Sequence, residues 1–107
     1  MFEIIEYETE GGESPFASWL EGLNDVNAMA RVDARILRLT EGLFGDCKPV
    51  GEGVWELRVD WGPGYRVYYA RAGKRLILLL CGGDKRKQST DIRRSIRYWK
   101  NWQARTK

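Results

Sequence analysis

The strongest constraint on the fold is a series of three strand-like segments in the second half of the chain, at residues 54–59, 65–71 and 75–81. The first two alternate between apolar and polar residues, and a Gly-Pro-Gly sequence at 62–64 joins them, which predicts an antiparallel hairpin. The third contains an unbroken apolar run at 76–80, which is typical of a strand buried on both faces. We therefore expect a three-stranded antiparallel meander.

A strand and a short helix are expected at the N-terminus. Residues 2–8 alternate weakly and predict the strand. Ser14 followed by Pro15 is typical of a helix start, because the hydroxyl can cap the helix and proline suits its first position. We expect this helix to end at Gly22.

A longer second helix is expected to begin at Asn24 or Asp25, since either residue can cap it. Its apolar residues recur at helical spacing along one stripe: Met29, Val32, Ile36, Leu39 and Leu43. The opposite stripe carries three arginines, which form either a solvated face or part of a partner surface: Arg31, Arg35 and Arg38.

Residues 47–53 contain a proline and two glycines and predict a loop. After the meander, Ser89 or Thr90 can cap a last helix. The expected order is β-α-α-β-β-β-α, which is an α+β fold with a small antiparallel sheet, two N-terminal helices and one C-terminal helix. Because the chain has 107 residues and no repeat or linker, we expect one domain over residues 1–107.

Charge is distributed unevenly along the chain, although the net charge is only +3. Residues 1–25 contain seven acids and no lysine or arginine, whereas residues 84–107 contain nine bases and two acids. A basic C-terminal end favours a polyanion or an acidic protein as partner. The alternative is a helix and tail whose charges are simply solvated.

Composition predicts a cytoplasmic protein with no membrane contact. No apolar run approaches the roughly 20 residues that a membrane-spanning helix needs, and the acidic N-terminus differs from a signal peptide. Cys47 and Cys81 lack the spacing of a metal or redox motif, so we expect two free thiols in a reducing compartment.

The sequence contains no histidine, which excludes Ser–His–Asp and Cys–His catalytic sites and removes the commonest metal ligand. It has neither a glycine-rich nucleotide loop nor acidic residues at metal-ligand spacing, so we expect no metal and no other cofactor. The remaining chemistry requires mainly positive charge and positioned donors. RNA cleavage meets that description, because RNA supplies its own nucleophile, the 2′-hydroxyl.

Three basic residues are the candidate catalytic groups. Arg58 and Arg66 would stabilise the charge that develops on the phosphoryl oxygens, since an arginine fork binds phosphate in two places. Lys85 would take part in proton transfer, which falls to lysine, tyrosine or a carboxylate where histidine is absent. The two arginines share a face only in the register that pairs them; after a slip of one residue Arg66 would instead anchor Glu56 or a helix end. The alternative for Arg58 is an ordinary solvated strand arginine.

Five further residues are candidates for RNA contact. Arg86 and Lys87 would hold the RNA backbone, and Trp61 and Tyr65 lie near the turn, where a splayed base could stack. Gln88 completes the set, although its structural alternative is a hydrogen bond to the loop backbone. For Tyr65 the alternative is a place in the core.

Three sequence signatures carry a resemblance to a known family: W-E-L-R at 55–58, G-P-G-Y-R-V at 62–67 and G-G-D-K-x-x-Q-x-x-D-I at 82–92. Through them the chain resembles the RelE/ParE superfamily of toxins in bacterial toxin–antitoxin pairs, and most closely its HigB-like branch of addiction module killer proteins. The likeness spans nearly the whole chain. It implies the same α+β architecture and a site position for the arginine of W-E-L-R.

The resemblance also implies partners and an activity. The expected activity is endoribonucleolytic cleavage of mRNA, often on the ribosome, and the expected protein partner is an antitoxin of the helix-turn-helix type. DNA would be contacted only through the complex with the antitoxin. Two alternatives stay open: a ParE-like inhibitor of DNA gyrase that cleaves no RNA, and a degenerate toxin that only binds its antitoxin.

Overall fold

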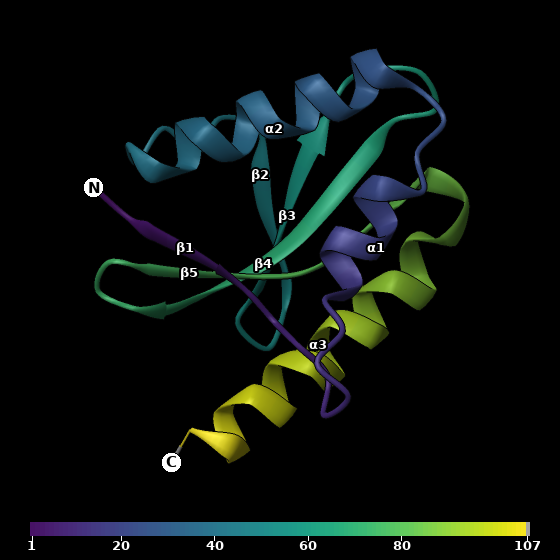
Figure 1. Cartoon of the computed structure of the whole chain (residues 1–107). Helices are drawn as coiled ribbons and strands as arrows, with labels where there is room; N and C mark the ends of the chain where they lie inside the picture. Colours follow the sequence, from purple (N-terminus) through teal and green to yellow (C-terminus); the bar gives the residue numbers. More distant parts are fainter. Residues whose placement is uncertain (107) are drawn as a thin grey trace.

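A five-stranded mixed sheet in the order β1-β5-β4-β3-β2 forms the centre of the computed structural model, which describes residues 1–106 (Figure 1). The strands are β1 (Glu3–Glu6), β2 (Cys47–Gly51), β3 (Val54–Val59), β4 (Tyr65–Gly73) and β5 (Leu76–Asp84). The helices are α1 (Pro15–Glu21), α2 (Val26–Thr40) and α3 (Gln88–Arg105), and a 3₁₀ turn (Lys85–Lys87) precedes α3. The α+β class predicted from the sequence is confirmed.

The antiparallel meander β3-β4-β5 is also confirmed. The loop between β3 and β4 turns through Gly62 and Gly64, whose positive φ angles of 55° and 83° favour glycine. This loop pairs Val59 with Tyr65 and therefore sets the register of the whole hairpin. As the apolar run predicted, β5 lies between β1 and β4 and is buried on both faces.

Two features of the sheet differ from the prediction. Residues 47–51, expected in a loop, form the edge strand β2, which pairs with β3 and has a register shift between Pro49 and Gly51. Proline is tolerated there because one side of an edge strand needs no hydrogen bonds. The second difference is that β1 pairs with β5 in parallel, which makes the sheet mixed.

The helix starts follow the capping signals in the first half of the chain. Ser14 accepts a hydrogen bond from the Ala17 amide at 3.1 Å, and Asp25 accepts one from the Asn27 amide at 2.9 Å. Leu43, expected on the apolar stripe of the second helix, was placed wrongly, because α2 ends at Thr40 and Leu43 lies beyond it, exposed. The last helix also begins earlier than Ser89, directly after the 3₁₀ turn.

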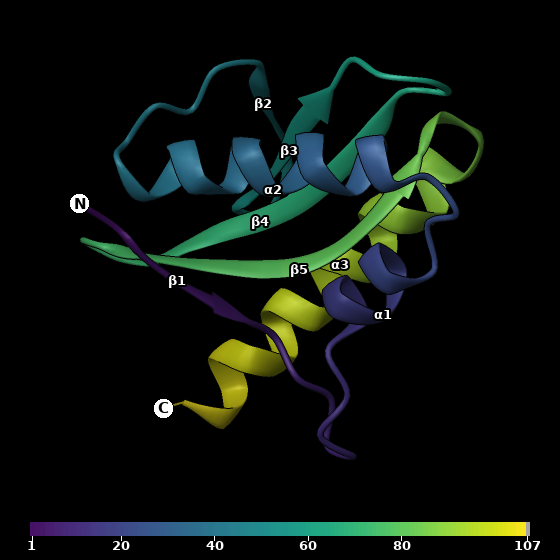
Figure 2. The same cartoon turned by 45° about the horizontal axis from the view of Figure 1, so that its top comes forward.

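The two sheet faces carry separate apolar cores. Helices α1 and α2 cover one face, where Phe16, Val32 and Leu39 pack on alternate residues of β3, β4 and β5. Helix α3 covers the other face, where Trp99 packs on Tyr68 and its neighbours. Figure 2 shows α2 on one side of the sheet and α3 on the other. Because side chains alternate between faces, Glu56 and Arg58 lie on the α3 side while Leu57 lies on the α2 side.

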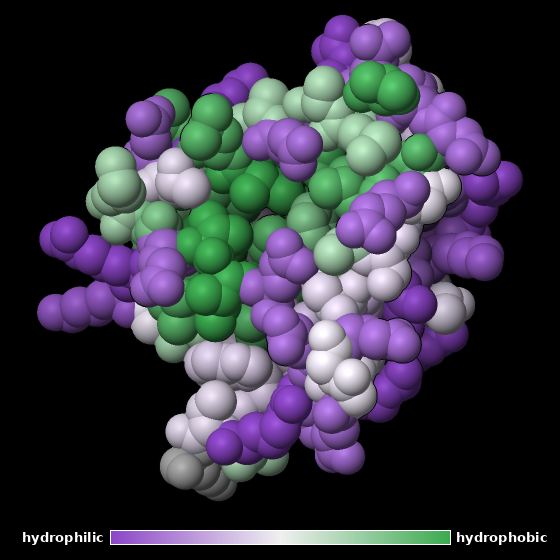
Figure 3. Space-filling view, in the orientation of Figure 1, coloured by the Kyte–Doolittle hydropathy of each residue, from purple (hydrophilic) through white to green (hydrophobic). Residues whose placement is uncertain are grey.

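Figure 3 shows apolar residues gathered between α2 and the crossing of β1 with β5, surrounded by hydrophilic ones. Phe2, Ile4 and Ile36 are partly buried hydrophobic residues of the core beneath α2. Within residues 1–106, no helix is both long enough and apolar enough to cross a membrane.

We predict that the Asp25 cap makes stability depend on pH. Its carboxylate accepts hydrogen bonds from Trp61 Nε1 at 3.1 Å and from the first turn of α2, and these lower its pKa below 3.8. A lowered pKa stabilises the folded protein above pH 3.8, and this contribution is lost as the pH falls through the folded-state value. Asp25→Asn should therefore unfold at lower urea concentration than the wild type at pH 7, and the difference should vanish near pH 2.

The exposed acid Asp33 on the same helix provides the control. Asp33→Asn should behave like the wild type at both pH values. A difference between Asp25→Asn and the wild type that persists unchanged at pH 2 would contradict this account of the cap.

We also predict that Gly82 is required for the packing of α1 on β5. A Cβ at Gly82 would overlap the Trp19 ring, whereas one at Gly73 would meet only Leu76 Cβ, at 3.7 Å. Gly82→Ala should cost about 1–3 kcal/mol of unfolding free energy through overpacking. Gly73→Ala should be neutral or slightly stabilising. Urea denaturation of both variants checks this, and equal stabilities would refute it.

Candidate functional site

The register of the β3–β4 hairpin places Arg58 directly opposite Arg66 and Glu56 directly opposite Tyr68. Residues that face each other across an antiparallel pair point to the same side of the sheet. All four side chains therefore lie on the α3 face, near the hairpin turn. The structure shows that the two arginines share a face, which the sequence had left open.

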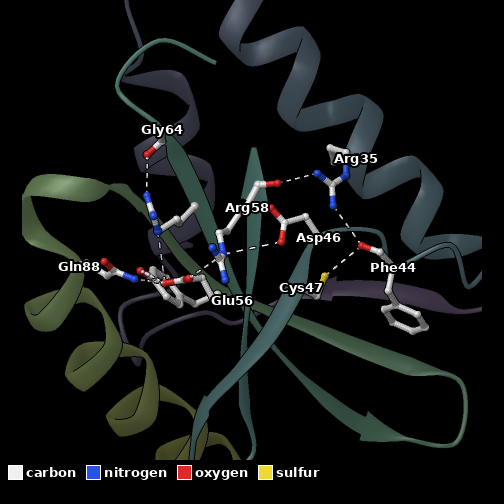
Figure 4. Close-up of polar contacts among 10 residues, drawn as sticks. Arg35, Phe44, Asp46, Cys47, Glu56, Arg58, Gly64 and Gln88 are labelled. Carbon is white, nitrogen blue, oxygen red and sulfur yellow. Dashed lines mark hydrogen bonds and ion pairs between the residues drawn. The ribbon is translucent and has the colours of Figure 1, made fainter. Parts of the chain in front are cut away.

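Glu56 is the centre of this group, because its carboxylate is fully buried and four side chains converge on it (Figure 4). Tyr68 Oη donates to Glu56 Oε2 at 3.0 Å, and Gln88 Nε2 donates to the same oxygen at 2.8 Å. The Nε atoms of Arg58 and Arg66 lie 3.5 Å from Oε1 and Oε2, respectively. A buried carboxylate needs such partners, since an unpaired buried charge is strongly unfavourable.

The partners of Glu56 depend on its charge in turn. Arg66 is only 7% exposed, so its guanidinium relies on Glu56 for compensation. Burial and the neighbouring Glu56 carboxylate raise the pKa of Tyr68 well above its usual value. Tyr68 is therefore a hydrogen-bond donor throughout the physiological range. The group is held together as one ionised unit.

The arginines retain unused hydrogen-bonding capacity. The Nε atoms of Arg58 and Arg66 are buried and have no hydrogen-bond partner among residues 1–106, since the contacts with Glu56 are ion pairs at 3.5 Å. Arg66 Nη1 donates to the Gly64 carbonyl at 3.0 Å, whereas the 37%-exposed side chain of Arg58 is oriented by ion pairs with Glu56 and Asp46. The fork of Arg58 is thus oriented from behind and free to bind an anion.

A surface depression of about 270 Å³ lies in front of the two arginines. The charged and aromatic residues that line it are Asp46, Arg58, Asp60, Tyr65, Arg66 and Lys85. Lys85 is exposed, and Tyr65 is partly buried against Trp19, with 6.1 Å between the ring centroids. Four of the predicted site residues therefore line one depression: Arg58, Tyr65, Arg66 and Lys85.

The other predicted contact residues are placed elsewhere. Trp61 donates to Asp25 and its ring is covered by the Arg31 guanidinium 3.9 Å from the centroid, so one face of the indole is already occupied. Arg86 pairs with Asp84 at 2.8 Å, and with Lys87 it lines a second depression beyond β5. Gln88 lies behind the site, where it binds the Glu56 carboxylate and not the loop backbone.

Three carboxylates at the site did not figure among the predicted site residues. Glu56 precedes Arg58 by two positions in the strand, so alternation alone puts both on one face; this signal was present in the sequence. Asp46 directly precedes the unpredicted strand β2, whose pairing brings it to the depression, whereas Asp60 directly follows the predicted strand β3. Within residues 1–106, no group of three or more His, Cys, Asp or Glu residues is placed to hold a metal ion.

The backbone beneath Arg58 is fixed by α2. Arg35 Nη1 donates to the Arg58 carbonyl at 2.5 Å, and its Nη2 donates to the Phe44 carbonyl at 3.1 Å. Arg35 is therefore not a member of a uniformly solvated stripe; it ties the helix to the end of β3. Arg31 and Arg38 are exposed, which is compatible with either expectation for this stripe, a solvated face or part of a partner surface.

Two comparisons with known proteins cover this site. A family model described as "Phage derived protein Gp49-like" matches residues 19–97, from α1 into α3. An uncharacterized protein of Haemophilus influenzae is 50% identical over 80 residues, which are 75% of this chain and 81% of the relative. The segment that the family model matches contains Glu56, Arg58, Arg66 and Lys85.

We predict that Glu56→Gln destabilises the protein by about 3 kcal/mol or more, because it leaves the Arg66 guanidinium buried without a counter-charge. Tyr68→Phe is the matched comparison, since it removes one hydrogen bond to the same oxygen and should cost only about 1–2 kcal/mol. Urea denaturation measures both. If the Glu56 variant is as stable as the wild type, the carboxylate does not hold the arginines as described.

Proposed function

We propose that this chain, which belongs to the Gp49-like family of phage-derived proteins, is the toxin of a toxin–antitoxin module. The family is associated with addiction module killer toxins. The RelE/ParE-like signatures of the sequence support the same assignment, and the α+β fold agrees with it. A toxin of this kind requires an antitoxin, so we infer a protein partner that neutralises it.

We further propose that the toxin is an endoribonuclease that cleaves mRNA. One observation carries this proposal: two arginines on the same sheet face border one depression together with a lysine. Guanidinium forks bind phosphate oxygens in two places and remain charged at every physiological pH. The arrangement therefore suits a phosphodiester that gains negative charge in the transition state.

The proposed reaction uses only groups of the RNA and of this chain. The 2′-oxygen forms a bond to phosphorus as the bond to the 5′-oxygen breaks, which yields a 2′,3′-cyclic phosphate and a 5′-hydroxyl. Arg58 and Arg66 stabilise the charge on the non-bridging oxygens. The proton of the 2′-hydroxyl passes to a carboxylate that lines the depression, Asp46 or Asp60, and Lys85 supplies a proton to the leaving 5′-oxygen.

We expect cleavage of a defined mRNA in a cell-free translation reaction to be a sensitive test of this activity. The protein is added to a cell-free translation reaction with a defined mRNA, and new 5′ ends are mapped. Cuts inside the reading frame should appear with the wild type and fall about 100-fold in rate with Arg58→Ala, the typical effect of removing one donor from a preorganised site. A 2′-deoxy nucleotide on the 5′ side of a mapped cut should block that cut.

Arg75→Ala is the matched control, because Arg75 is exposed in the turn between β4 and β5, at the opposite end of the sheet from the site. It removes the same charge and should leave cleavage unchanged. Full cleavage by a folded Arg58→Ala variant would show that the site is wrong. Intact mRNA with unimpeded translation, together with loss of gyrase supercoiling, would replace the nuclease with a gyrase inhibitor.

A further inference from the structure

A second depression, of about 240 Å³, lies beyond the C-terminal end of β5, between α1 and α3. Strand β1 pairs with β5 only as far as Leu79, so the last residues of β5 form an open sheet edge at this point. The depression is lined by Trp19, Gly82, Gly83, Asp84, Arg86, Lys87, Asp91 and Arg94, of which Asp84 and Arg86 form an ion pair with each other at 2.8 Å. The other side chains combine an aromatic ring, a carboxylate and two cations within one small space.

The two glycines allow these walls to approach the strand closely. A Cβ at Gly82 would overlap the Trp19 ring, and a Cβ at Gly83 would overlap Asp91 Oδ2. The indole and the carboxylate therefore lie directly against the β5 backbone, on opposite faces of the sheet. The glycine pair is needed for this geometry and not for an unusual backbone angle, since neither residue has a positive φ.

The polar groups of the depression are only partly satisfied. Asp91 is 5% exposed, and its Oδ1 accepts a hydrogen bond from Arg94 Nη2 at 3.2 Å, while its Oδ2 accepts none from residues 1–106. Arg94 Nε is buried without a hydrogen-bond partner in the same part of the chain. The Asp91 carboxylate is an acceptor and the Arg94 guanidinium beside it is a donor, so together they suit a ligand that has donors and acceptors on one edge.

The depression adjoins the proposed cleavage site through two residue pairs of β4 and β5. Arg66 pairs with Gly83, and Tyr65 pairs with Asp84. Arg66 and Tyr65 on β4 line the depression at the cleavage site, and Gly83 and Asp84 on β5 line the depression between α1 and α3. Neighbouring strands are about 4.8 Å apart. The two depressions therefore adjoin each other across neighbouring strands, so one RNA strand can contact both.

We propose that the depression between α1 and α3 binds a guanine base of the RNA next to the scissile phosphate, an inference that rests on the proposed ribonuclease function. The guanine N1–H and N2–H groups donate to the Asp91 carboxylate, and its O6 accepts from Arg94 or Lys87. The Trp19 indole supplies an aromatic surface for the base. These pairings match the recognition of guanine by arginine and lysine and the acceptance of base amino protons by aspartate.

Other bases fit the same groups less well. Adenine and cytosine each present one amino donor on the pairing edge next to a ring acceptor, which would face the carboxylate unfavourably. Uracil has one N–H between two carbonyls. Guanine alone presents two adjacent donors and an acceptor in one row, so the depression should discriminate in its favour.

Binding of uncleavable RNA tests this proposal separately from cleavage. Fluorescence anisotropy is measured with labelled 2′-O-methyl pentamers that differ only in a single guanine, inosine, adenine or cytosine. The guanine pentamer should bind about 10–100-fold more tightly than the adenine pentamer. Inosine, which lacks the N2 amino group, should lie between them. Equal affinities for all four pentamers would overturn the proposal.

Two substitutions in the depression and one control elsewhere test whether the preference for guanine arises at this site. Asp91→Asn should reduce the preference for guanine over adenine at least 10-fold while leaving the affinity for the adenine pentamer within about twofold. Trp19→Phe leaves a smaller aromatic surface for the base, so it should weaken the binding of all four pentamers alike while the ratio between guanine and adenine is kept. Asp33→Asn, an exposed acid on α2, should match the wild type.

The outcomes separate this inference from the proposed function. Arg58-dependent cleavage without any base preference, or a guanine preference unaffected by Asp91→Asn, would overturn the guanine subsite and leave the ribonuclease in place. A guanine preference that depends on Asp91, in a protein that cleaves no RNA under translation conditions, would support the subsite and overturn the ribonuclease.

Discussion

The site depends on the burial of one carboxylate. Glu56 is inaccessible to solvent and lies in contact with two arginines, a tyrosine and a glutamine from β3, β4 and the start of α3. Burying a charge is unfavourable unless partners compensate it, and partners that are themselves charged cannot leave without the same penalty. Glu56 therefore directs both guanidiniums and ties the start of α3 to the hairpin whose register the β3–β4 loop sets.

This interaction also explains why sequence reasoning reached the fold more securely than the site. Alternation and the glycine turn were sufficient to predict the meander, because each is a local signal with one main structural solution. These signals were not sufficient to predict the register of the hairpin, since a slip of one residue changes the sheet face on which every side chain lies. The hydrogen bond from Gln88 to Glu56 spans 32 positions, and no local pattern predicts such a contact.

The misassigned segment at 47–51 has a related cause. An edge strand with Pro49 and a register shift lacks both alternation and an uninterrupted apolar run, so its strand character comes only from pairing with β3. That pairing brings Asp46 to Arg58, at 3.8 Å. A site carboxylate was thus missed because the strand that positions it was missed. The position of Trp61 near the turn was predicted correctly, but its contacts were not, because its partners Asp25 and Arg31, at the cap and in the first turns of α2, are distant in sequence.

The carboxylates beside the arginines have two opposite effects on the binding of an anion. Each of them lowers the net positive charge at the depression, which weakens the attraction for a singly charged anion at long range. They also hold the guanidiniums in place, so little conformational entropy is lost when an anion binds. A site arranged in this way gains most from charge that develops during a reaction, because the donors need no reorganisation. For a chain without histidine, the arginines, the lysine and the two carboxylates at the depression are the groups on which the proposed phosphodiester transfer depends.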